Sequence, residues 1–342
     1  MPSTTETTLA VFRSNQGAVI YRIPLEAFNN FWVYVYVVLL GDDIVLIDTG
    51  SGYGNSNDHL KRGLEQVSRL EGREISLATL TYVLLTHGHI DHFGGLAYVQ
   101  PRTSAKIGVH ELDRRTITNY EERLVFIAHR LEQYFIKAGV PRAVRENLLS
   151  TYQVNKHLFH SVPIDFTYES VGMHVGEFEM LHVPGHCPGH VVMRLHNVLF
   201  VGDHVLNRIS PHMAPETITL NTGLGHYIAS LESLAAWAHG DELILGGHES
   251  MVENLYMRIP AIIAHHKERL ADVRAFLSTP HTIYEVSQHL FRGITGYNAI
   301  LAVEEAGAHV EYLYQYGDLA IHNLSDFDDS HGPIPLYYLS IA

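Results

Sequence analysis

Residues 80–95 read LTYVLLTHGHIDHFGG. The first half of this stretch, Tyr82 to Leu85, is a short apolar run with a β-branched residue, which is typical of a buried strand. The run ends at Thr86. Four side chains able to bind a metal then fall within six residues: His87, His89, Asp91 and His92.

The spacing of these four side chains predicts two neighbouring metal positions. In an extended segment, residues two apart point the same way, so His87 and His89 can reach one ion. If Asp91 and His92 open the next helix, they turn toward a second position beside the first. Neutral imidazole and carboxylate together suit zinc, iron(II) or manganese. A histidine-rich surface turn would leave the preceding buried strand unexplained.

A His-x-His-x-Asp-His segment after a buried strand resembles the metallo-β-lactamase superfamily of binuclear metallohydrolases. The resemblance implies four further elements, and each occurs in order along the chain. They are Asp48-Thr49-Gly50 after an early strand, Gly185-His186 after a later one, Gly202-Asp203 at the end of a strand, and Gly247-His248 at the end of the last strand. It also implies an α/β fold, the metallo-β-lactamase αββα sandwich.

The same resemblance implies a ligand set and a mechanism. His87, His89 and His186 would hold the first metal. Asp91, His92 and His248 would hold the second, and Asp203 would bridge the two ions. The expected cofactors are two divalent ions, zinc first and iron(II) or manganese as alternatives. A hydroxide shared by the ions would be the nucleophile, with Asp91 aligning it or passing a proton, so Asp91 and Asp203 are the predicted catalytic residues.

Three further residues lie near these motifs, and two of them are expected to support the site. The order Gly-His-x-Pro-Gly-His at residues 185–190 resembles the glyoxalase-II-like branch, in which the second histidine, here His190, supports the site and is not a ligand. Cys187 is adjacent to His186, but we do not interpret it as a ligand. Asp48 is expected behind the metal ligands, and a turn-forming aspartate before Gly50 is the alternative.

Composition limits the class of protein and its partners. The chain has 342 residues with 46% hydrophobic and 18% charged residues, which is typical of a globular protein. Its net charge is −14, and no run of Lys and Arg exceeds two residues, as at Arg114-Arg115. These features argue against nucleic acid as a partner and favour a small-molecule substrate, with a homodimer left open. No apolar run approaches the roughly 18 residues of a membrane helix.

Two further features predict a cytoplasmic location. Residues 1–8 lack the basic start and apolar centre of a signal peptide. Cys187 is the only cysteine in the sequence, which excludes an internal disulfide and fits a reducing compartment.

The chain is expected to form two domains. Residues 1–260 would be the catalytic domain, with a helical insert at about 111–160, and residues 261–342 a small α+β domain that resembles a winged-helix tail. The apolar stripe from Leu124 to Ala138 predicts either core packing or a roof over the site. If the insert is a roof, the candidates for a substrate pocket are Tyr120, Phe126 and Tyr134.

The loop after Asp203 and the tail carry other candidates. Arg208, His212 and Asn221 could contact substrate, with solvated loop residues as the alternative. Residues 299–306 and 309–316 predict two short helices. The second would be the recognition helix of a winged helix, yet it has Glu311 and no Lys or Arg, which favours packing or dimerisation over DNA binding. Five tail histidines are expected at the surface or in caps: His281, His289, His309, His322 and His331.

These observations favour a binuclear metal-dependent hydrolase of a small-molecule thioester, ester or lactone. The alternative is a phosphodiesterase or ribonuclease, like relatives in the superfamily that carry a similar tail, but the acidic charge argues against it. Hydrolysis of a β-lactam or another amide and a non-catalytic binding protein with the same fold are the remaining alternatives. The sequence contains no G-x-S-x-G segment, the pattern that would suggest a serine nucleophile.

Overall fold

The structure, a computed structural model, describes residues 7–156 and 158–341. Residues 1–6, most of the stretch assessed for a signal peptide, lie outside this part. The chain divides into two compact units, described separately below. The first comprises Met1–Tyr120, Phe159–Pro211 and Ser230–Ile259, and the second comprises Glu121–Leu158, His212–Ala229 and Pro260–Ala342. The division thus groups the helical insert with the C-terminal helices.

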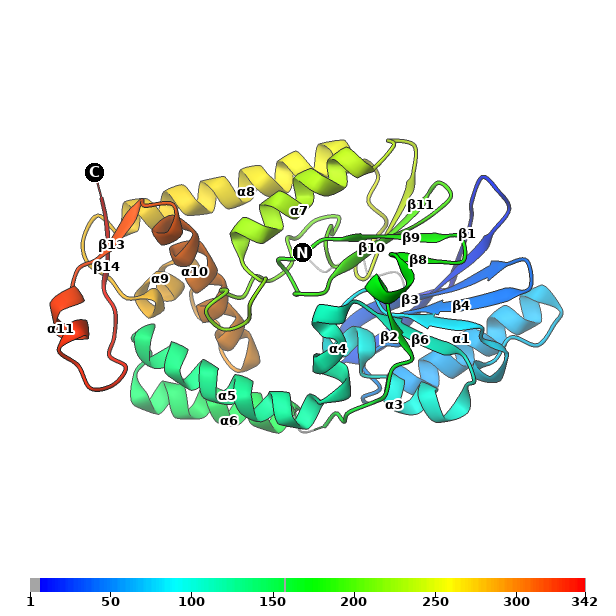
Figure 1. Cartoon of the computed structure of the whole chain (residues 1–342), viewed down its shortest axis with the longest axis horizontal. Coiled ribbons are helices and arrows are strands. Elements are labelled where there is room, and N and C mark those ends of the chain that lie inside the picture. Colours follow the sequence, from blue (N-terminus) through cyan, green and yellow to red (C-terminus); the bar gives the residue numbers. More distant parts are fainter. Residues whose placement is uncertain (1–6, 157, 342) are drawn as a thin grey trace. The chain divides into compact units, whose positions relative to one another are not determined.

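The first unit contains a seven-stranded mixed sheet with its strands in chain order (Figure 1). The first four strands are antiparallel, and β4 to β7 are parallel. The strands are β1 (Ala10–Arg13), β2 (Val19–Phe28), β3 (Phe31–Leu40), β4 (Asp43–Ile47), β5 (Tyr82–Leu84), β6 (Lys106–Val109) and β7 (Phe166–Thr167). β3 and β4 form a hairpin. The turn between β2 and β3 places Asn30 at φ 58°, a conformation that asparagine tolerates better than most residues.

A five-stranded sheet forms the second layer, in the order β12-β11-β10-β9-β8. Only β11 and β12 are parallel. The strands are β8 (His174–Val175), β9 (Phe178–His182), β10 (Val191–Leu195), β11 (Val198–Gly202) and β12 (Leu243–Gly246). A buried cluster that includes Tyr36 and Ile47 of the first sheet and Met193 and Phe200 of the second lies between the two layers. The predicted α/β sandwich is therefore confirmed.

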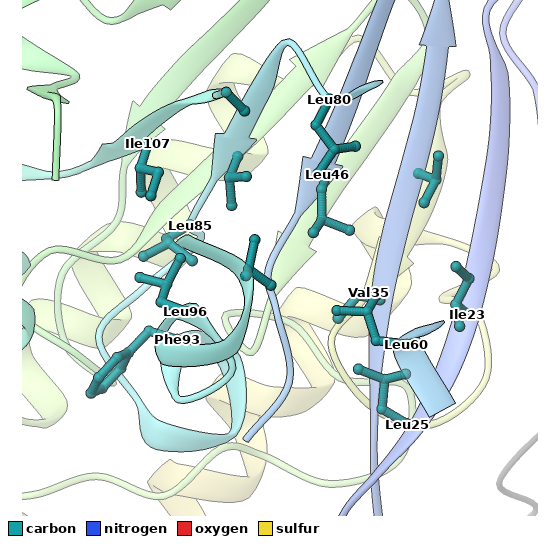
Figure 2. Packing of buried hydrophobic residues seen from close by; sticks show 14 of the residues in the cluster. Ile23, Leu25, Val35, Leu46, Leu60, Leu80, Leu85, Phe93, Leu96 and Ile107 are labelled. Carbon is teal, nitrogen blue, oxygen red and sulfur yellow. The ribbon is translucent and has the colours of Figure 1, made fainter. Parts of the chain in front are cut away.

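Helices cover the outer face of the seven-stranded sheet. They are α1 (Ser56–Glu71), α2 (Ile90–Phe93), α3 (Leu96–Val99) and α4 (Glu111–Thr118). In Figure 2, Leu60 of α1 lies beside Val35 and Leu25, while Phe93 and Leu96 lie beside Leu85. The helical turn that carries Asp91 and His92 is thus anchored to the sheet by fully buried apolar side chains, each worth about 1.5–3 kcal/mol.

The second unit is mainly helical. Its elements include α5 (Tyr120–Lys137), α6 (Arg142–Lys156), α9 (Ile283–Leu290), α10 (Tyr297–Gln315), α11 (Leu324–Asp328) and the antiparallel pair β13 (Leu319–Ile321) and β14 (Tyr338–Ser340). Thr282 caps α9 through a capping box with Glu285. Three helices have residues in both units: α5, whose first residue, Tyr120, belongs to the first unit, α7 (Leu224–Trp237) and α8 (Leu255–Phe276). None of the helices in the described part of the chain has the length and hydropathy needed to span a membrane.

Three expectations about secondary structure are wrong. The alternating pattern of residues 160–164 predicts a strand, but they form none. Residues 299–306 and 309–316 are not two helices, because α10 continues through Gly307. Pro260 is expected to mark a boundary before a connecting helix, but it lies inside α8. A single proline or glycine lowers helix propensity, but packing of the neighbouring residues overrides that preference here: Ile259 and Ile262 beside Pro260 are buried, and so are Ala306 and Ala308 beside Gly307.

Candidate metal centre

The metal-binding segment begins where β5 ends and α2 starts. His89 occupies the N-cap position of α2 in extended conformation, so the chain turns from strand to helix between His89 and Asp91. The other predicted ligands lie beyond the ends of strands in the second sheet: His186 follows β9, Asp203 follows β11, and His248 follows β12.

The structure brings all seven predicted metal ligands together, in two groups. His87, His89 and His186 form the first group. Asp91, His92, Asp203 and His248 form the second, and in each group the potential ligand atoms lie within 4.8 Å of one another. Asp203 contacts both: its Oδ2 lies 3.7 Å from His186 Nε2 and 3.2 Å from His248 Nε2, and its Oδ1 lies 3.3 Å from His92 Nε2. This is the position expected for a carboxylate shared by two ions.

The electrostatics of the two groups differ. Burial opposes ionisation of Asp203, but His248 and His92 outweigh it and hold the pKa of its carboxyl well below the ordinary range. Burial also opposes protonation of His248, yet Asp203 and Asp91 raise the pKa of that imidazole to about 10. His87 behaves in the opposite way, because burial and then the nearby His92 lower its pKa well below 6.5.

These properties fit a divalent cation. His87 is fully buried, and its Nε2 has no hydrogen-bond partner among the described residues. Burying such an atom without a partner costs free energy, and a neutral imidazole nitrogen is what a metal ligand requires. The two ionised carboxylates of the centre, those of Asp91 and Asp203, supply the negative charge that a dication would offset. The donor set of imidazole and carboxylate suits zinc, iron or manganese.

Buried groups behind the ligands fix their orientation, as metal sites usually require. Asp48 Oδ2 lies 2.7 Å from His92 Nδ1 and also accepts the Thr86 hydroxyl at 2.8 Å, while Oδ1 accepts the Thr86 N–H at 2.8 Å. The Trp32 carbonyl accepts from His248 Nδ1 at 2.6 Å. The prediction that Asp48 lies behind the ligands is confirmed.

His190 has the supporting position that was predicted for it. Its Nε2 accepts the Asp203 backbone N–H at 3.1 Å, and its ring stacks on His87 with centroids 4.6 Å apart and planes inclined by 21°. Cys187 turns its thiol toward Asp113, at 3.2 and 3.3 Å from the two carboxylate oxygens, and does not belong to either group of ligand atoms.

Sequence analysis missed Asp113. Its side chain is fully buried and accepts the backbone N–H groups of Gly88 and Gly189. Asp113 is the third residue of α4, where an acidic residue is ordinarily explained by its favourable interaction with the helix N-terminus. No feature of the local sequence distinguished it from an ordinary residue of the first helical turn.

The open side of the centre can be recognised from exposure. His89 and Asp91 are half-buried, whereas the other five predicted ligands are buried. Beside them, the ring of Phe31 lies 4.8 Å from the His248 imidazole and is 46% exposed. Phe28 stacks near Phe31 at 6.3 Å, and Tyr53 lies 6.1 Å from Phe28. An aromatic surface thus borders the metal centre, and sequence analysis did not identify it.

Several predicted substrate contacts have other roles. Tyr120 is buried beside Phe93 and Phe159, and Tyr134 is buried with its hydroxyl donating to the Val303 carbonyl at 3.0 Å. Both are core residues, so their prediction as pocket residues is wrong. Phe126 is 59% exposed on α5. Arg208 is exposed, and its backbone N–H donates to Glu249 at 2.8 Å.

The remaining loop candidates lie in the second unit. His212 Nε2 is 3.4 Å from Glu304 Oε2. The Asn221 backbone N–H donates to Glu216 at 3.2 Å.

The second unit contains a third group of possible ligands, His266, Glu305 and His309. The prediction that His309 is a surface or capping residue is wrong, because it is fully buried. Its Nδ1 donates to the Glu305 carbonyl at 2.8 Å, and its Nε2 lies 3.2 Å from His266 Nδ1.

The carboxylate of this group is also engaged within the protein. Glu305 accepts from Arg269 at 2.7 Å and from the Met213 N–H at 2.7 Å. Since most donor atoms of the group already have protein partners and a guanidinium lies against its only carboxylate, we interpret it as a buried hydrogen-bond network.

Comparison with known proteins agrees with this geometry. The family model described as the metallo-beta-lactamase superfamily matches residues 31–248. The "Probable metallo-hydrolase YqjP" of Bacillus subtilis is 24% identical over 313 residues, which is 88% of this chain and 93% of that protein. The "Hydroxyacylglutathione hydrolase" of Shewanella baltica is 27% identical over 188 residues, 52% of this chain and 49% of that protein.

Solved structures show the same fold. A metallo-beta-lactamase family protein from Thermus thermophilus superposes with a TM-score of 0.73 at 24% identity, covering 94% of this chain and 98% of that one. A beta-lactamase domain protein from Burkholderia ambifaria gives 0.71 at 21% identity, covering 97% and 94%. The family match spans the whole set of predicted ligands, and the chain therefore belongs to the metallo-β-lactamase superfamily, as a metal-dependent hydrolase.

Proposed function

We propose that this protein hydrolyses an acyl bond, a thioester, ester or lactone, in a small molecule, with two divalent metal ions at the centre. The observation that carries the proposal is the position of Asp203, whose carboxylate contacts both groups of imidazoles. In this assignment the first ion is held by His87, His89 and His186, the second by Asp91, His92 and His248, and Asp203 serves both. Zinc is the expected metal, and iron(II) and manganese suit the same donors.

When bound, two divalent ions acidify water near neutral pH and polarise the bond to be cleaved. The chain supplies orientation and negative charge. The Trp32 carbonyl accepts a hydrogen bond from His248 Nδ1–H, and the Asp48 carboxylate accepts one from His92 Nδ1–H, so that Nε2 of both rings faces the centre. Asp91 lies on the open side. Burial opposes its ionisation, but His92 and His248 lower the pKa of its carboxyl below the ordinary range, so it is ionised at pH 7 and can align water by accepting a hydrogen bond.

The surface beside the centre supports an acyl substrate with an apolar part. Phe31 and Tyr53 are both 46% exposed, and Phe31 lies against the His248 imidazole. An aromatic ring of this size contributes substantial apolar contact area. An acyl chain lying along Phe31 would bring its carbonyl toward His248 and Asp91, whose Nε2 and Oδ2 atoms lie 3.2 Å apart.

Two further observations favour acyl transfer over phosphodiester cleavage. The relative from Shewanella baltica is named as a hydrolase of hydroxyacylglutathione, an acyl compound. The chain has a net charge of −14, and α10 contains no Lys or Arg, which disfavours a polyanionic substrate. We infer that nucleic acid is not a partner.

The test is a pH-stat assay of zinc-loaded protein on matched thioesters, esters, lactones, a β-lactam and a phosphodiester. Release of protons reports acyl hydrolysis without a chromophore. We expect turnover of the acyl compounds, which disappears after chelation and in Asp203→Ala. The control is Asp165→Asn, because Asp165 also accepts a backbone N–H, from Ile107 at 2.9 Å, but belongs to neither ligand group.

Inactivity on every acyl compound, in protein that retains two equivalents of zinc, would contradict the proposal. Turnover of the phosphodiester alone would assign the site to phosphodiesterase chemistry instead. Full activity of Asp203→Ala would contradict the assignment of the centre.

A further inference from the structure

Asp113 connects two segments that are far apart in the sequence and that both carry predicted metal ligands. Its Oδ2 accepts the Gly88 N–H at 2.7 Å, and its Oδ1 accepts the Gly189 N–H at 3.0 Å. Gly88 lies between His87 and His89, and Gly189 lies three residues after His186. The thiol of Cys187, next to His186, faces the same carboxylate at 3.2 Å. One buried carboxylate therefore holds both segments of the first ligand group.

The approach of these segments to Asp113 leaves no room for side chains. A Cβ atom at Gly88 would lie 3.0 Å from Asp113 Cγ, and one at Gly189 would lie 2.7 Å from Cγ and 2.8 Å from the backbone nitrogen. Contacts this close force the surrounding atoms to move. Glycine at both positions thus allows the backbone to reach the carboxylate directly.

The start of α4, which carries Asp113, is itself fixed to the second segment. His110, the N-cap residue, stacks on His182 with ring centroids 3.9 Å apart, and its Nε2 lies 2.8 Å from Glu169 Oε1. His182 Nε2 donates to the Pro188 carbonyl at 2.8 Å. Because these contacts hold the helix in place, Asp113 has little freedom to follow the two loops if they separate.

We propose that Asp113 is a positioning residue that sets the separation of His87 and His89 from His186, and thereby the affinity of the first metal position. The proposal rests on the ligand assignment of the proposed function. Asp48 supports the second position directly, since it contacts His92, and it also contacts Thr86, whose hydroxyl lies 3.0 Å from His87 Nδ1. The Asp113 carboxylate contacts the segments of the first group, so its substitution should affect the first position alone.

The experiment is a competitive zinc titration of the metal-free full chain against a chromophoric chelator. In Asp113→Asn we expect one of the two zinc equivalents to bind about 10–100-fold more weakly, as loss of a group behind a metal ligand typically causes, while the other equivalent keeps its affinity. Hydrolytic activity should recover in excess zinc, because no group that touches substrate is altered. The control is Asp165→Asn, because Asp165 accepts the backbone N–H of Ile107 in β6. This variant should bind both zinc equivalents as tightly as the unsubstituted protein does.

A second variant, His186→Ala, identifies which of the two zinc equivalents is weakened by Asp113→Asn. His186→Ala removes a ligand of the first position, so adding Asp113→Asn to it should leave the remaining equivalent unchanged. If Asp113→Asn does not fold, Cys187→Ala removes only one of the three donors to the carboxylate, and a smaller weakening of the same equivalent is expected.

Unchanged affinity of both equivalents in Asp113→Asn, or in Cys187→Ala if that variant is the one tested, would overturn the proposal. Equal weakening of both equivalents would overturn it as well, because that indicates a general loss of structure. Zinc binding is measured without substrate, so these outcomes are independent of whether acyl hydrolysis is found.

Discussion

Asp48 contacts His92 through Oδ2 and Nδ1 at 2.7 Å, and it does so from the left-handed region of the Ramachandran map, at φ 60°. The residue stands just beyond β4, and its carboxylate also binds Thr86 at the end of the neighbouring strand. Aspartate and asparagine tolerate this conformation better than other side chains with a Cβ. The contact therefore depends on the conformation of the strand end as well as on the charge of the side chain.

We expect Asp48→Asn to keep the backbone conformation and to lose the charge beside His92. Metal affinity at the second position should fall by about 10–100-fold, and kcat/KM should fall with it at limiting zinc. Zinc titration and steady-state kinetics would measure both effects. Asp43→Asn, in the same strand β4, is the control and should show neither. Unchanged zinc affinity in Asp48→Asn would mean that the charge of Asp48 does not contribute to metal binding.

The pH dependence of stability should reveal Glu305 in the second unit. Burial raises the pKa of its carboxyl from 4.5 to about 7, although Arg269 and the Met213 N–H act in the opposite direction. Between these two values the folded state retains a proton that the unfolded chain has released. Stability therefore decreases as pH rises through this window, by up to about 1.4 kcal/mol per pH unit, and this contribution is fully present only below pH 4.5.

Glu305→Gln removes this titration. We expect the variant to gain stability relative to the unsubstituted protein when the pH is raised from about 5 to about 7, as measured by urea unfolding at each pH. Glu268→Gln, at an exposed position of α8, is the control and should track the unsubstituted protein at both values. A constant difference between Glu305→Gln and the unsubstituted protein across the window would show that Glu305 is ionised throughout.

Packing of α5 against α10 within the second unit depends on Gly307. A Cβ atom there would overlap the Tyr134 hydroxyl and lie 2.9 Å from its Cζ. Helix propensity alone favours alanine over glycine by about 1 kcal/mol, but overpacking a rigid core costs about 1–3 kcal/mol. We expect the second effect to prevail, so Gly307→Ala should lower the free energy of unfolding.

Two further variants check this explanation. Tyr134→Leu combined with Gly307→Ala should cost less than the sum of the single substitutions in a double-mutant cycle. Gly225→Ala in α7, where the nearest side-chain atom to a new Cβ is 3.8 Å away, should be neutral or stabilising. Additive costs in the cycle would mean that Tyr134 and Gly307 do not restrict each other.

The parts of the structure that sequence predicted share a physical basis. His87, His89, Asp91 and His92 fall within six residues, so their grouping follows from local spacing, and the strand before them is marked by its apolar run. His186, Asp203 and His248 each follow a strand and a glycine, and the resemblance supplied their order. The resemblance implies the sandwich of two sheets as well, whereas the strand before His87 is predicted from its own apolar pattern.

The parts that sequence did not predict depend on contacts between distant residues. Asp113 lies 25 positions from Gly88 and 76 from Gly189, and nothing in its helix indicates which backbone groups it meets. His309 was assigned to the surface by its residue type alone, yet α10 buries it against His266. Helix α10 continues through Gly307, where close packing against Tyr134 requires glycine. Helix propensity read from a single sequence gives no sign of this contact.

The aromatic surface beside His248 offers a test of substrate preference. Phe31 is 46% exposed and contacts the imidazole of His248 at 4.8 Å between ring centroids, but it supplies no metal-binding atom. Phe31→Ala should therefore raise KM for substrates with long acyl groups, by about 5–30-fold if roughly one to two kcal/mol of apolar contact is lost. For an acetyl substrate KM should change little, and kcat should remain similar for both.

The measurement is a comparison of steady-state kinetics for a series of acyl chain lengths on one leaving group. Leu70→Ala, an exposed apolar residue of α1, is the matched control, because it removes comparable surface away from the centre. A loss that is the same for every chain length would show that Phe31 supports His248 and does not contact the acyl group. A loss that grows with chain length assigns the acyl chain to this surface and fixes the direction from which substrate reaches Asp91.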